Sequence, residues 1–265
     1  MYTEEIIIDR ELIAKHKDKN ETIYFNSKFN FLNQHNGIRP NKMHLLIAPT
    51  HVGKSTLVHS IIDSTVVDNN NISVMLYLTE ETTDDYISAI SHFVDGDEIK
   101  GKIRCMVEDK TETDESIKKA ITQAIDMHKP KIFFIDNVTT CKLYQDRGTE
   151  KQSETAMWLK SLLKKTTLFI VAHTNGNDYN KEMLNENHIR GSKTITNITE
   201  FMYVLQPIKL NNTLYQYLRI IKHRGQSMRD NFFLLIWDGK SRTMSGDMPK
   251  NFDDFKELFS VRNKL

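Results

Sequence analysis

The sequence predicts an α/β protein whose central sheet is mainly parallel, is flanked by helices and ends in antiparallel strands on its C-terminal side. Two observations carry this prediction. Between residues 43 and 173, apolar runs typical of buried strands alternate with helical patterns, which indicates parallel strands joined by helices. After residue 173, three strand-like runs follow one another without a helix between them, which favours antiparallel hairpins.

The alternating part of the chain is assigned element by element from its apolar spacing. Strands are predicted at residues 43–48, 71–79, 102–107, 131–136 and 167–173. Helices are predicted at residues 53–67, 113–128 and 153–164. In the second of these helices Ile117, Ile121 and Ile125 share one face, and Pro130 closes the helix.

The remaining predicted elements lie towards the two ends of the chain. Strands are predicted at residues 201–206, 214–222 and 231–237, with a short helix at 9–17 and an amphipathic helix at 251–261. The chain has only 5 prolines and 10 glycines, so we expect no long disordered linker. The expected organisation is a polar leader at residues 1–36, one domain at 37–246 and an amphipathic tail at 247–265. The leader has a possible role in contacts between subunits.

Composition excludes several classes of protein. The 265 residues have a mean hydropathy of −0.49 and no apolar run of about 20 residues, so we expect no membrane span. The N-terminal residues include acids where a secretory signal needs positive charge, and two cysteines, Cys105 and Cys141, suit a reducing compartment. We therefore expect a cytoplasmic protein. With 36 basic and 35 acidic side chains, the chain does not bind nucleic acid by bulk charge, although a local basic channel is compatible with this balance.

Residues 48–56 match the pattern of a phosphate-binding loop, with alanine in place of the first glycine. The segment comprises Ala48, Pro49, Thr50, His51, Val52, Gly53, Lys54, Ser55 and Thr56. It lies between a predicted strand and a predicted helix, where backbone N–H groups can converge on phosphate oxygens. In such a loop Lys54 reaches the β- and γ-phosphates, and the Ser55 hydroxyl binds Mg²⁺. The alternative is a loop that contains Gly-Lys-Ser by chance.

Acidic side chains follow two of the predicted buried strands. Asp136 ends the strand at 131–136, where a carboxylate is costly to bury unless it serves a Mg²⁺–water cluster or caps the next turn. Glu80 and Glu81 follow the strand at 71–79, and a carboxylate beside the γ-phosphate can orient and deprotonate water. Glu80 is the preferred catalytic residue and Glu81 the second choice. The alternative is that both acids only favour the start of the next helix.

Two further positions end strands with polar groups. His173 ends the strand at 167–173, where it can sense a γ-phosphate or be a satisfied structural histidine. Lys222 and Arg224 lie near the end of a late strand. They can form a solvated basic edge or contact phosphate across a subunit boundary, and spacing alone leaves both readings open.

This ordered set of motifs resembles the RecA-like core of ring-shaped replicative helicases of the DnaB type and their phage and mitochondrial relatives. The turn at residues 36–42 (NGIRPNK) is similar to the family's turn before its first strand, and residues 188–200 (HIRGSKTITNITE) are similar to a segment that precedes the family's Lys-x-Arg strand. The resemblance covers residues 20–245. The chain departs from the family in its short leader, while its Glu80–Glu81 pair is also similar to KaiC-like and RadA-like ATPases.

The resemblance implies a P-loop NTPase that forms a homo-oligomer, expected to be a hexameric ring, with ATP and Mg²⁺ between subunits. Lys54, Ser55 and Asp136 would hold the nucleotide, Glu80 would activate water, and Lys222 and Arg224 would reach the neighbour's nucleotide. The implied activity is a phage or plasmid DNA helicase that hydrolyses ATP and moves on single-stranded DNA in replication, with primase as a possible partner.

In a fold of this kind two loops face the channel of the ring. The first loop follows Asp136, around residues 139–151, and contains Lys142, Arg147 and Lys151. Lys181 and Arg190 lie in the second, which follows His173. These cations can grip the backbone of a single strand, or the loops can be solvated polar segments without that role.

Two other functions remain open for the same fold. One is a strand-exchange recombinase of the RadA type, which would pair homologous strands without unwinding a fork. The other is a non-motor nucleotide switch, such as a helicase loader or a KaiC-like regulator, whose ATP hydrolysis would not respond to single-stranded DNA.

Overall fold

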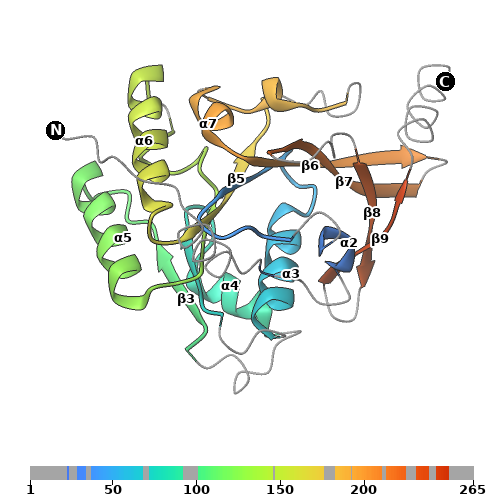
Figure 1. The fold of residues 1–265 in the computed structure, drawn as a ribbon, viewed down its shortest axis with the longest axis horizontal. Coiled ribbons are helices and arrows are strands. Elements are labelled where there is room, and N and C mark those ends of the chain that lie inside the picture. Colours follow the sequence, from blue (N-terminus) through green and yellow to red (C-terminus); the bar gives the residue numbers. More distant parts are fainter. Residues whose placement is uncertain are drawn as a thin grey trace, which may run out of the picture.

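A computed structural model describes residue 23 and residues 29–33, 37–67, 72–91, 101–145, 147–175, 183–191, 193–210, 213–224, 231–238 and 243–250. Within these residues the chain forms a nine-stranded sheet in the order β3-β2-β4-β5-β1-β6-β7-β8-β9 (Figure 1). The helices predicted at 9–17 and 251–261 lie outside the described residues. None of the described helices is both long and apolar enough to cross a membrane.

The first strands of the chain make the parallel part of the sheet. They are β1 (Met43–Ala48), β2 (Val74–Leu78), β3 (Ile103–Val107), β4 (Ile132–Asp136) and β5 (Thr167–His173). They pair in parallel, and β6 (Phe201–Leu210) joins them by pairing in parallel with β1. Then β7 (Thr213–His223), β8 (Asn231–Asp238) and β9 (Thr243–Lys250) continue the sheet in antiparallel fashion. The predicted α/β class, with its antiparallel C-terminal end, is confirmed.

Helices cover both faces of the sheet, which explains why β1, β2, β4 and β5 are buried along their whole length. One apolar cluster joins the sheet to α2 (Asn30–Asn33), α3 (Lys54–Val67) and α4 (Thr83–Ile90). A second cluster joins the other face to α5 (Asp114–His128), α6 (Thr149–Leu162) and α7 (Lys193–Ile198). Successive residues of β1 alternate between the clusters, with Leu46 in the first and Leu45 in the second.

Several elements differ from the sequence prediction. The helix α4 was not assigned, although Thr82 caps its N-terminus in a capping box with Asp85. The helix α6 begins at 149, four residues before its predicted start, and the short α7 was missed. The strand β9 was also missed because Gly246 and Pro249 are poor strand formers, and it runs across the expected boundary between residues 246 and 247.

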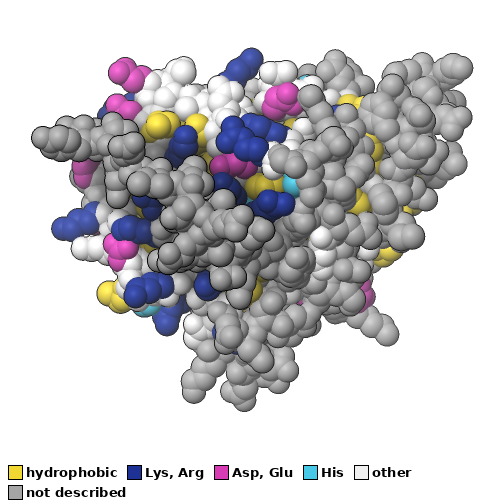
Figure 2. Space-filling model, viewed as in Figure 1, with side chains coloured by type: hydrophobic (Ala, Val, Ile, Leu, Met, Phe, Trp, Pro, Cys, Tyr) yellow, Lys and Arg dark blue, Asp and Glu magenta, His cyan; other side chains and the backbone are white. Residues whose placement is uncertain are grey.

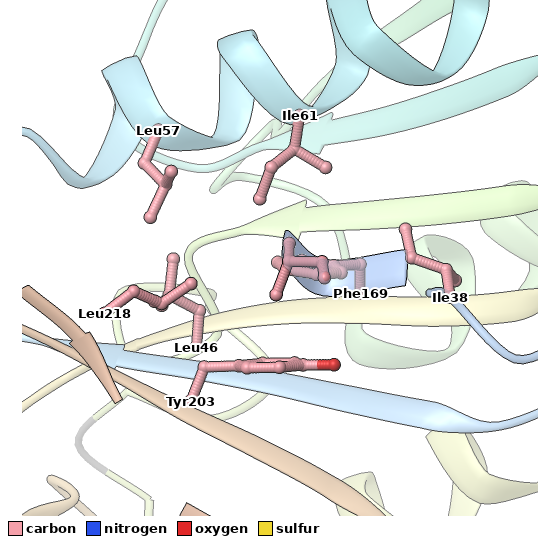
Figure 3. A pocket seen from close by; sticks show the side chains of 8 residues that line it. Ile38, Leu46, Leu57, Ile61, Phe169, Tyr203 and Leu218 are labelled. Atoms are coloured by element: carbon pink, nitrogen blue, oxygen red, sulfur yellow. The ribbon is translucent and has the colours of Figure 1, made fainter. Parts of the chain in front are cut away.

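The described part of the leader packs against the domain of its own chain. Ile23 forms an isolated bridge with Ile38, and Phe29 and Leu32 are buried. Figure 3 shows the apolar interface beneath them, where Leu57 and Ile61 of α3 point towards side chains of the sheet. This interface encloses a void of about 10 Å³, which has room for about one water molecule and is lined by Leu32, Ile38, Leu46, Leu57, Ile61, Phe169, Tyr203 and Leu218. The void is therefore a packing defect, too small to bind a ligand.

A buried histidine lies in this same layer. The His44 ring stacks on Phe201 with centroids 4.6 Å apart, and Phe169 and Tyr203 lie nearly parallel to it at 6.1 Å. Its Nδ1 is 3.1 Å from the Tyr203 hydroxyl, and its Nε2 accepts a hydrogen bond from the backbone N–H of Arg39 at 3.3 Å. Burial lowers the pKa of His44 from 6.5 to about 3, so the ring is neutral in the folded protein.

Candidate functional site

The predicted site residues converge because of the strand order. The strands β2, β4, β5 and β1 are consecutive neighbours and run in parallel, so the residues that follow their C-terminal ends meet at one edge of the sheet. Ala48, Asp136 and His173 end three of these strands, and Glu80 follows the fourth.

The loop at 48–56 turns sharply into α3. His51 and Gly53 have φ of 60° and 83°, and the helix begins at Lys54 with no acid in its first turn. The φ of 83° at Gly53 favours glycine, and a Cβ there would also lie 2.6 Å from Cε of Met244, so the Met244 side chain would have to shift. Within the loop Pro49 and Val52 are buried, Thr50 and His51 are exposed, and Ser55 and Thr56 are half-buried. The free N–H groups of a helix N-terminus next to such a turn suit an anion.

Lys54 is a buried cation between two carboxylates. Its side chain is 7% exposed, and its Nζ lies 3.6 Å from Oε2 of Glu80 and 3.8 Å from Oδ1 of Asp136. At these distances Lys54 forms an ion pair with each carboxylate but no direct hydrogen bond. Among the described residues, this buried ammonium at the mouth of the loop is held by two acids, and phosphate oxygens could replace either of them.

Glu80 is fixed by two neighbours on its other oxygen. Oε1 lies 2.9 Å from Nε2 of His173 and accepts a hydrogen bond of 3.2 Å from Nδ2 of Asn137. The hydrogen bond to His173 lowers the pKa of Glu80 to about 2 against the opposing effect of burial, and Lys54 adds to the lowering. Glu80 is thus ionised at neutral pH. Sequence reasoning missed Asn137, although it directly follows Asp136.

Asp136 has a buried oxygen, Oδ1, that contacts Lys54 at 3.8 Å. Its side chain is 6% exposed, and among the described residues Oδ1 has no hydrogen-bond partner. Burial raises the pKa of Asp136, whereas Lys54 and the Ser55 hydroxyl oppose that rise. A buried carboxylate oxygen that accepts no hydrogen bond from the described residues, on an acid that also interacts with the Ser55 hydroxyl, fits Mg²⁺, which prefers hard oxygen ligands.

The described residues contain no group of three His, Cys, Asp or Glu side chains that could hold a metal alone. This agrees with Mg²⁺ bound to a nucleotide, because such an ion takes one or two protein ligands and completes its shell with water and phosphate.

His173 connects the site to two loops, the one after β4 and the one after β5. Its backbone N–H donates to Oγ1 of Thr139 at 3.2 Å, and its carbonyl accepts from the N–H of Arg190 at 2.9 Å. Thr139 belongs to the loop after β4 and Arg190 to the loop after β5. The ring contact with Glu80 and these backbone bonds therefore join one residue to the carboxylate and to two loops.

An open cleft adjoins the phosphate loop on the side of the antiparallel strands. It measures about 390 Å³ and is lined by Gly53, Thr56, Tyr215, Gln216, Leu235, Trp237 and Met244. The Gln216 amide donates a hydrogen bond to the Val52 carbonyl, and the Trp237 side chain is 51% exposed. The aromatic and aliphatic lining of the cleft suits a flat apolar ring next to the phosphates. The sequence alone did not reveal this cleft, because β7, β8 and β9 reach the loop only through the register of the sheet.

Lys222 and Arg224 lie at the edge of the sheet where β1 begins, whereas Lys54 lies at the opposite edge, where β1 ends. Their strand β7 is antiparallel to β6, and His223 pairs with Phe201 near the start of β6. Arg224 is exposed, and Nζ of Lys222 donates to the Thr196 carbonyl at 2.8 Å. Figure 2 shows Lys and Arg side chains gathered near α7 on this face, with acids among them. Because the sheet separates the two places, neither cation is brought to the phosphate loop of its own chain.

The predicted nucleic-acid cations have different surroundings. Nζ of Lys142 donates to the carbonyls of Lys110 and Glu112, and Arg147 forms an ion pair with Asp114 at 2.9 Å. Lys151 and Arg190 are exposed. Lys181 lies outside the described residues. Lys142 and Arg147 thus hold the loop after β4 against the segment before α5. A role in nucleic-acid binding stays a prediction for all of these residues.

Comparison with known proteins identifies the fold. Neither models of protein families nor curated protein sequences give a match. Among solved structures, a KaiC-like protein from the hyperthermophilic archaeon Pyrococcus horikoshii OT3 is similar with a TM-score of 0.63 and 16% identity, over 80% of this chain and 92% of that one. At this identity the likeness establishes the fold, and the RecA-like α/β fold predicted from the sequence is confirmed. The narrower DnaB-type assignment is not established by it.

Proposed function

We propose that this protein is a Mg²⁺-dependent ATPase. The observation that carries the proposal is the convergence, at the N-terminus of α3, of a buried Lys54 with two strand-end carboxylates, one of them fixed by His173. Lys54 and the loop N–H groups would bind the β- and γ-phosphates, and Ser55 and Asp136 would hold the metal. The bound Mg²⁺ would neutralise charge on the phosphate oxygens.

Glu80 is the general base of this proposal. Its carboxylate would accept a hydrogen bond from the attacking water and take its proton, while Asn137 and His173 keep the carboxylate in place. The pKa of about 2 includes the contact with Lys54. When phosphates draw Lys54 away, Glu80 loses that cation and becomes a better base. Substrate binding would thereby prepare the catalytic group.

The cleft beside Gly53 would receive the base of the nucleotide. Stacking on Trp237 or Tyr215 needs no particular hydrogen-bonding pattern, so it accepts any planar base. The Gln216 amide also lines this cleft and is a polar group that can contact the edge of a base.

The active form in this proposal is a head-to-tail homo-oligomer, with a hexameric ring as the expected assembly. Support comes from Lys222 and Arg224, which lie on the edge of the sheet away from their own phosphate loop. In a head-to-tail ring that edge of one subunit faces the nucleotide of the next, where Arg224 would stabilise charge on the transferred phosphoryl group. Combined with the sequence resemblance, this supports a DnaB-type helicase that moves on single-stranded DNA, with a primase as an additional partner.

A second candidate is a nucleotide switch of the KaiC-like type, which acts through protein partners. Glu81 favours it, because a second carboxylate directly after Glu80 is the feature that the sequence shares with KaiC-like ATPases.

The experiment that separates these functions measures ATP hydrolysis with and without single-stranded DNA, together with the native mass. The helicase proposal expects an oligomer, stimulation by single-stranded DNA, and unwinding of forked DNA that the Lys54→Ala variant lacks. An oligomer whose hydrolysis ignores single-stranded DNA would support the switch. A monomer that hydrolyses ATP at full rate would contradict the role of Arg224.

A further inference from the structure

A histidine and a second carboxylate lie beside the phosphate loop and have no part in the reaction described above. Nε2 of His59 is 3.5 Å from Oε2 of Glu81. The His59 side chain is 8% exposed and the Glu81 side chain 29% exposed. His59 follows Ser55 by four residues on α3, so the two side chains share one face of the helix.

The histidine is held firmly in this position. Its ring meets the ring of Tyr86 edge to face, with centroids 4.9 Å apart. Tyr86 is buried on α4, the helix that begins shortly after Glu81. The His59 ring is therefore packed between α3 and α4, where it can donate from Nε2 to the carboxylate that precedes α4.

Glu81 reaches a different part of the site from Glu80. Glu80 contacts Lys54, Asn137 and His173. Glu81 interacts with His59, and the Ser55 hydroxyl also lowers the pKa of Glu81. The same hydroxyl lowers the pKa of Asp136. Since Ser55 and His59 share one face of α3, the contact with His59 places Glu81 on the Ser55 side of the site.

Both of these carboxylates keep a buried oxygen without a hydrogen bond. Among the described residues, Oε2 of Glu81 has only the 3.5 Å contact with Nε2 of His59, and Oδ1 of Asp136 has only the 3.8 Å contact with Nζ of Lys54, so neither oxygen accepts a hydrogen bond. Leaving a buried acceptor unsatisfied is costly, so such atoms indicate a missing donor. Mg²⁺ bound to a nucleotide keeps several water molecules, and each of them must donate its hydrogen bonds to nearby acceptors.

We propose that Glu81, held by His59, is a positioning residue for the metal: it orients the Ser55 hydroxyl and accepts a hydrogen bond from a metal-bound water. It is not the base that activates the attacking water, which remains Glu80. This inference rests on the proposed Mg²⁺-dependent nucleotide site and assigns separate tasks to two adjacent carboxylates.

The test measures binding of a fluorescent, non-hydrolysable ATP analogue to the full chain over a Mg²⁺ titration. In Glu81→Gln the Mg²⁺ concentration needed for half-maximal binding should rise 10- to 100-fold, which is the usual effect of losing a group that orients a metal ligand. Binding without Mg²⁺ should stay within two-fold of the wild type. His59→Phe keeps the ring against Tyr86 but removes the donor, so it should give a smaller rise in the same direction.

Two further variants define the comparison. Asp84→Asn removes an exposed acid from the first turn of α4 and should behave as the wild type. Glu80→Gln should bind Mg²⁺ and analogue normally but lose hydrolysis. At saturating Mg²⁺, Glu81→Gln should keep hydrolysis within a few-fold of the wild type, and a thermal melt of each variant confirms that it is folded.

The possible results are distinct. An unchanged Mg²⁺ requirement in folded Glu81→Gln would overturn the assignment. A variant that binds Mg²⁺ normally but no longer hydrolyses ATP would also overturn it, because Glu81 would then be the base. If the wild type itself binds no analogue at any Mg²⁺ concentration, the proposed function fails and this inference fails with it.

Discussion

Acid should destabilise this protein through His44, a histidine buried in an aromatic stack. Its ring is stacked among Phe169, Phe201 and Tyr203, and burial lowers its pKa from 6.5 to about 3. A backbone hydrogen bond with Arg39 opposes this lowering of the pKa, and the positive charge of the Arg39 side chain adds to it. In the unfolded chain the imidazole is free to bind a proton below pH 6.5, whereas the folded protein resists protonation until about pH 3.

The size of the effect follows from that difference. Stability rises with pH wherever the unfolded state binds more protons, so the contribution of His44 is complete above pH 6.5 and is lost as the pH falls towards about 3. Each pH unit within this window costs about 1.4 kcal/mol. The loss from His44 alone is therefore about 2 kcal/mol at pH 5, on the order of a fifth of the stability of a typical domain.

Urea unfolding at several pH values between 8 and 4.5 measures this loss. His44→Phe keeps an aromatic ring in the stack but removes the titrating group. It should be less stable than the wild type at pH 8 by about 1–3 kcal/mol, because the Tyr203 hydroxyl and the Arg39 N–H lose their partner. Its free energy of unfolding should then fall less steeply with acid, so that the two proteins converge near pH 5.

A matched control is His128→Asn, in the last turn of α5, which leaves the buried stack unchanged. It should follow the acid dependence of the wild type. Parallel curves for the wild type and His44→Phe across the whole range would refute the reasoning, since they would mean that His44 takes up no more protons on unfolding than phenylalanine does.

Three further predictions concern the nucleotide site. Glu80→Gln should lose at least 100-fold of the ATPase rate while keeping nucleotide affinity, measured by steady-state hydrolysis and equilibrium binding. Trp237→Ala should weaken nucleotide binding about 10-fold, because Trp237 lines the cleft for the base. Nucleotide should quench the tryptophan fluorescence of Trp158→Phe, which keeps Trp237, but not that of Trp237→Ala. Equal quenching in both variants would contradict the assignment of the cleft to the base. Arg224→Ala and Lys54→Ala should each be inactive alone, yet mixed oligomers should regain some ATPase activity, because one subunit can offer Arg224 to the intact phosphate loop of its neighbour. No recovery from oligomers shown to be mixed would argue against that shared site.

Much of this site was predictable because its parts follow a local rule. Lys54, Ser55 and Asp136 lie at the ends of parallel strands or at the start of a helix, and those positions meet wherever such strands are neighbours. Apolar alternation with helices was enough to predict the strands, and the predicted strand ends were therefore nearly right. The same rule placed His173, which ends β5, beside this group of residues.

The parts that were missed depend on long-range packing. Trp237 and Gln216 reach the phosphate loop only because the hairpin of β7 and β8 returns along the sheet in a particular register, which no local pattern encodes. The strand β9 has a sequence that disfavours strands, yet the backbone N–H of Met244 donates to Ser60 of α3 and its side chain lies next to Gly53. Tertiary contacts there override the local preference.

The two acids after β2 show why spacing could not separate their roles. Glu80 and Glu81 lie in the bend that follows β2, and their side chains have different partners. In the structure Glu80 turns towards His173 at the end of β5, and Glu81 turns towards His59 on α3. The first can therefore act on water near the γ-phosphate while the second acts on the metal side of Ser55. Because each acid has its own histidine, exchanging Glu80 for Gln should not be rescued by Glu81, whose position is fixed on the wrong side for the attacking water.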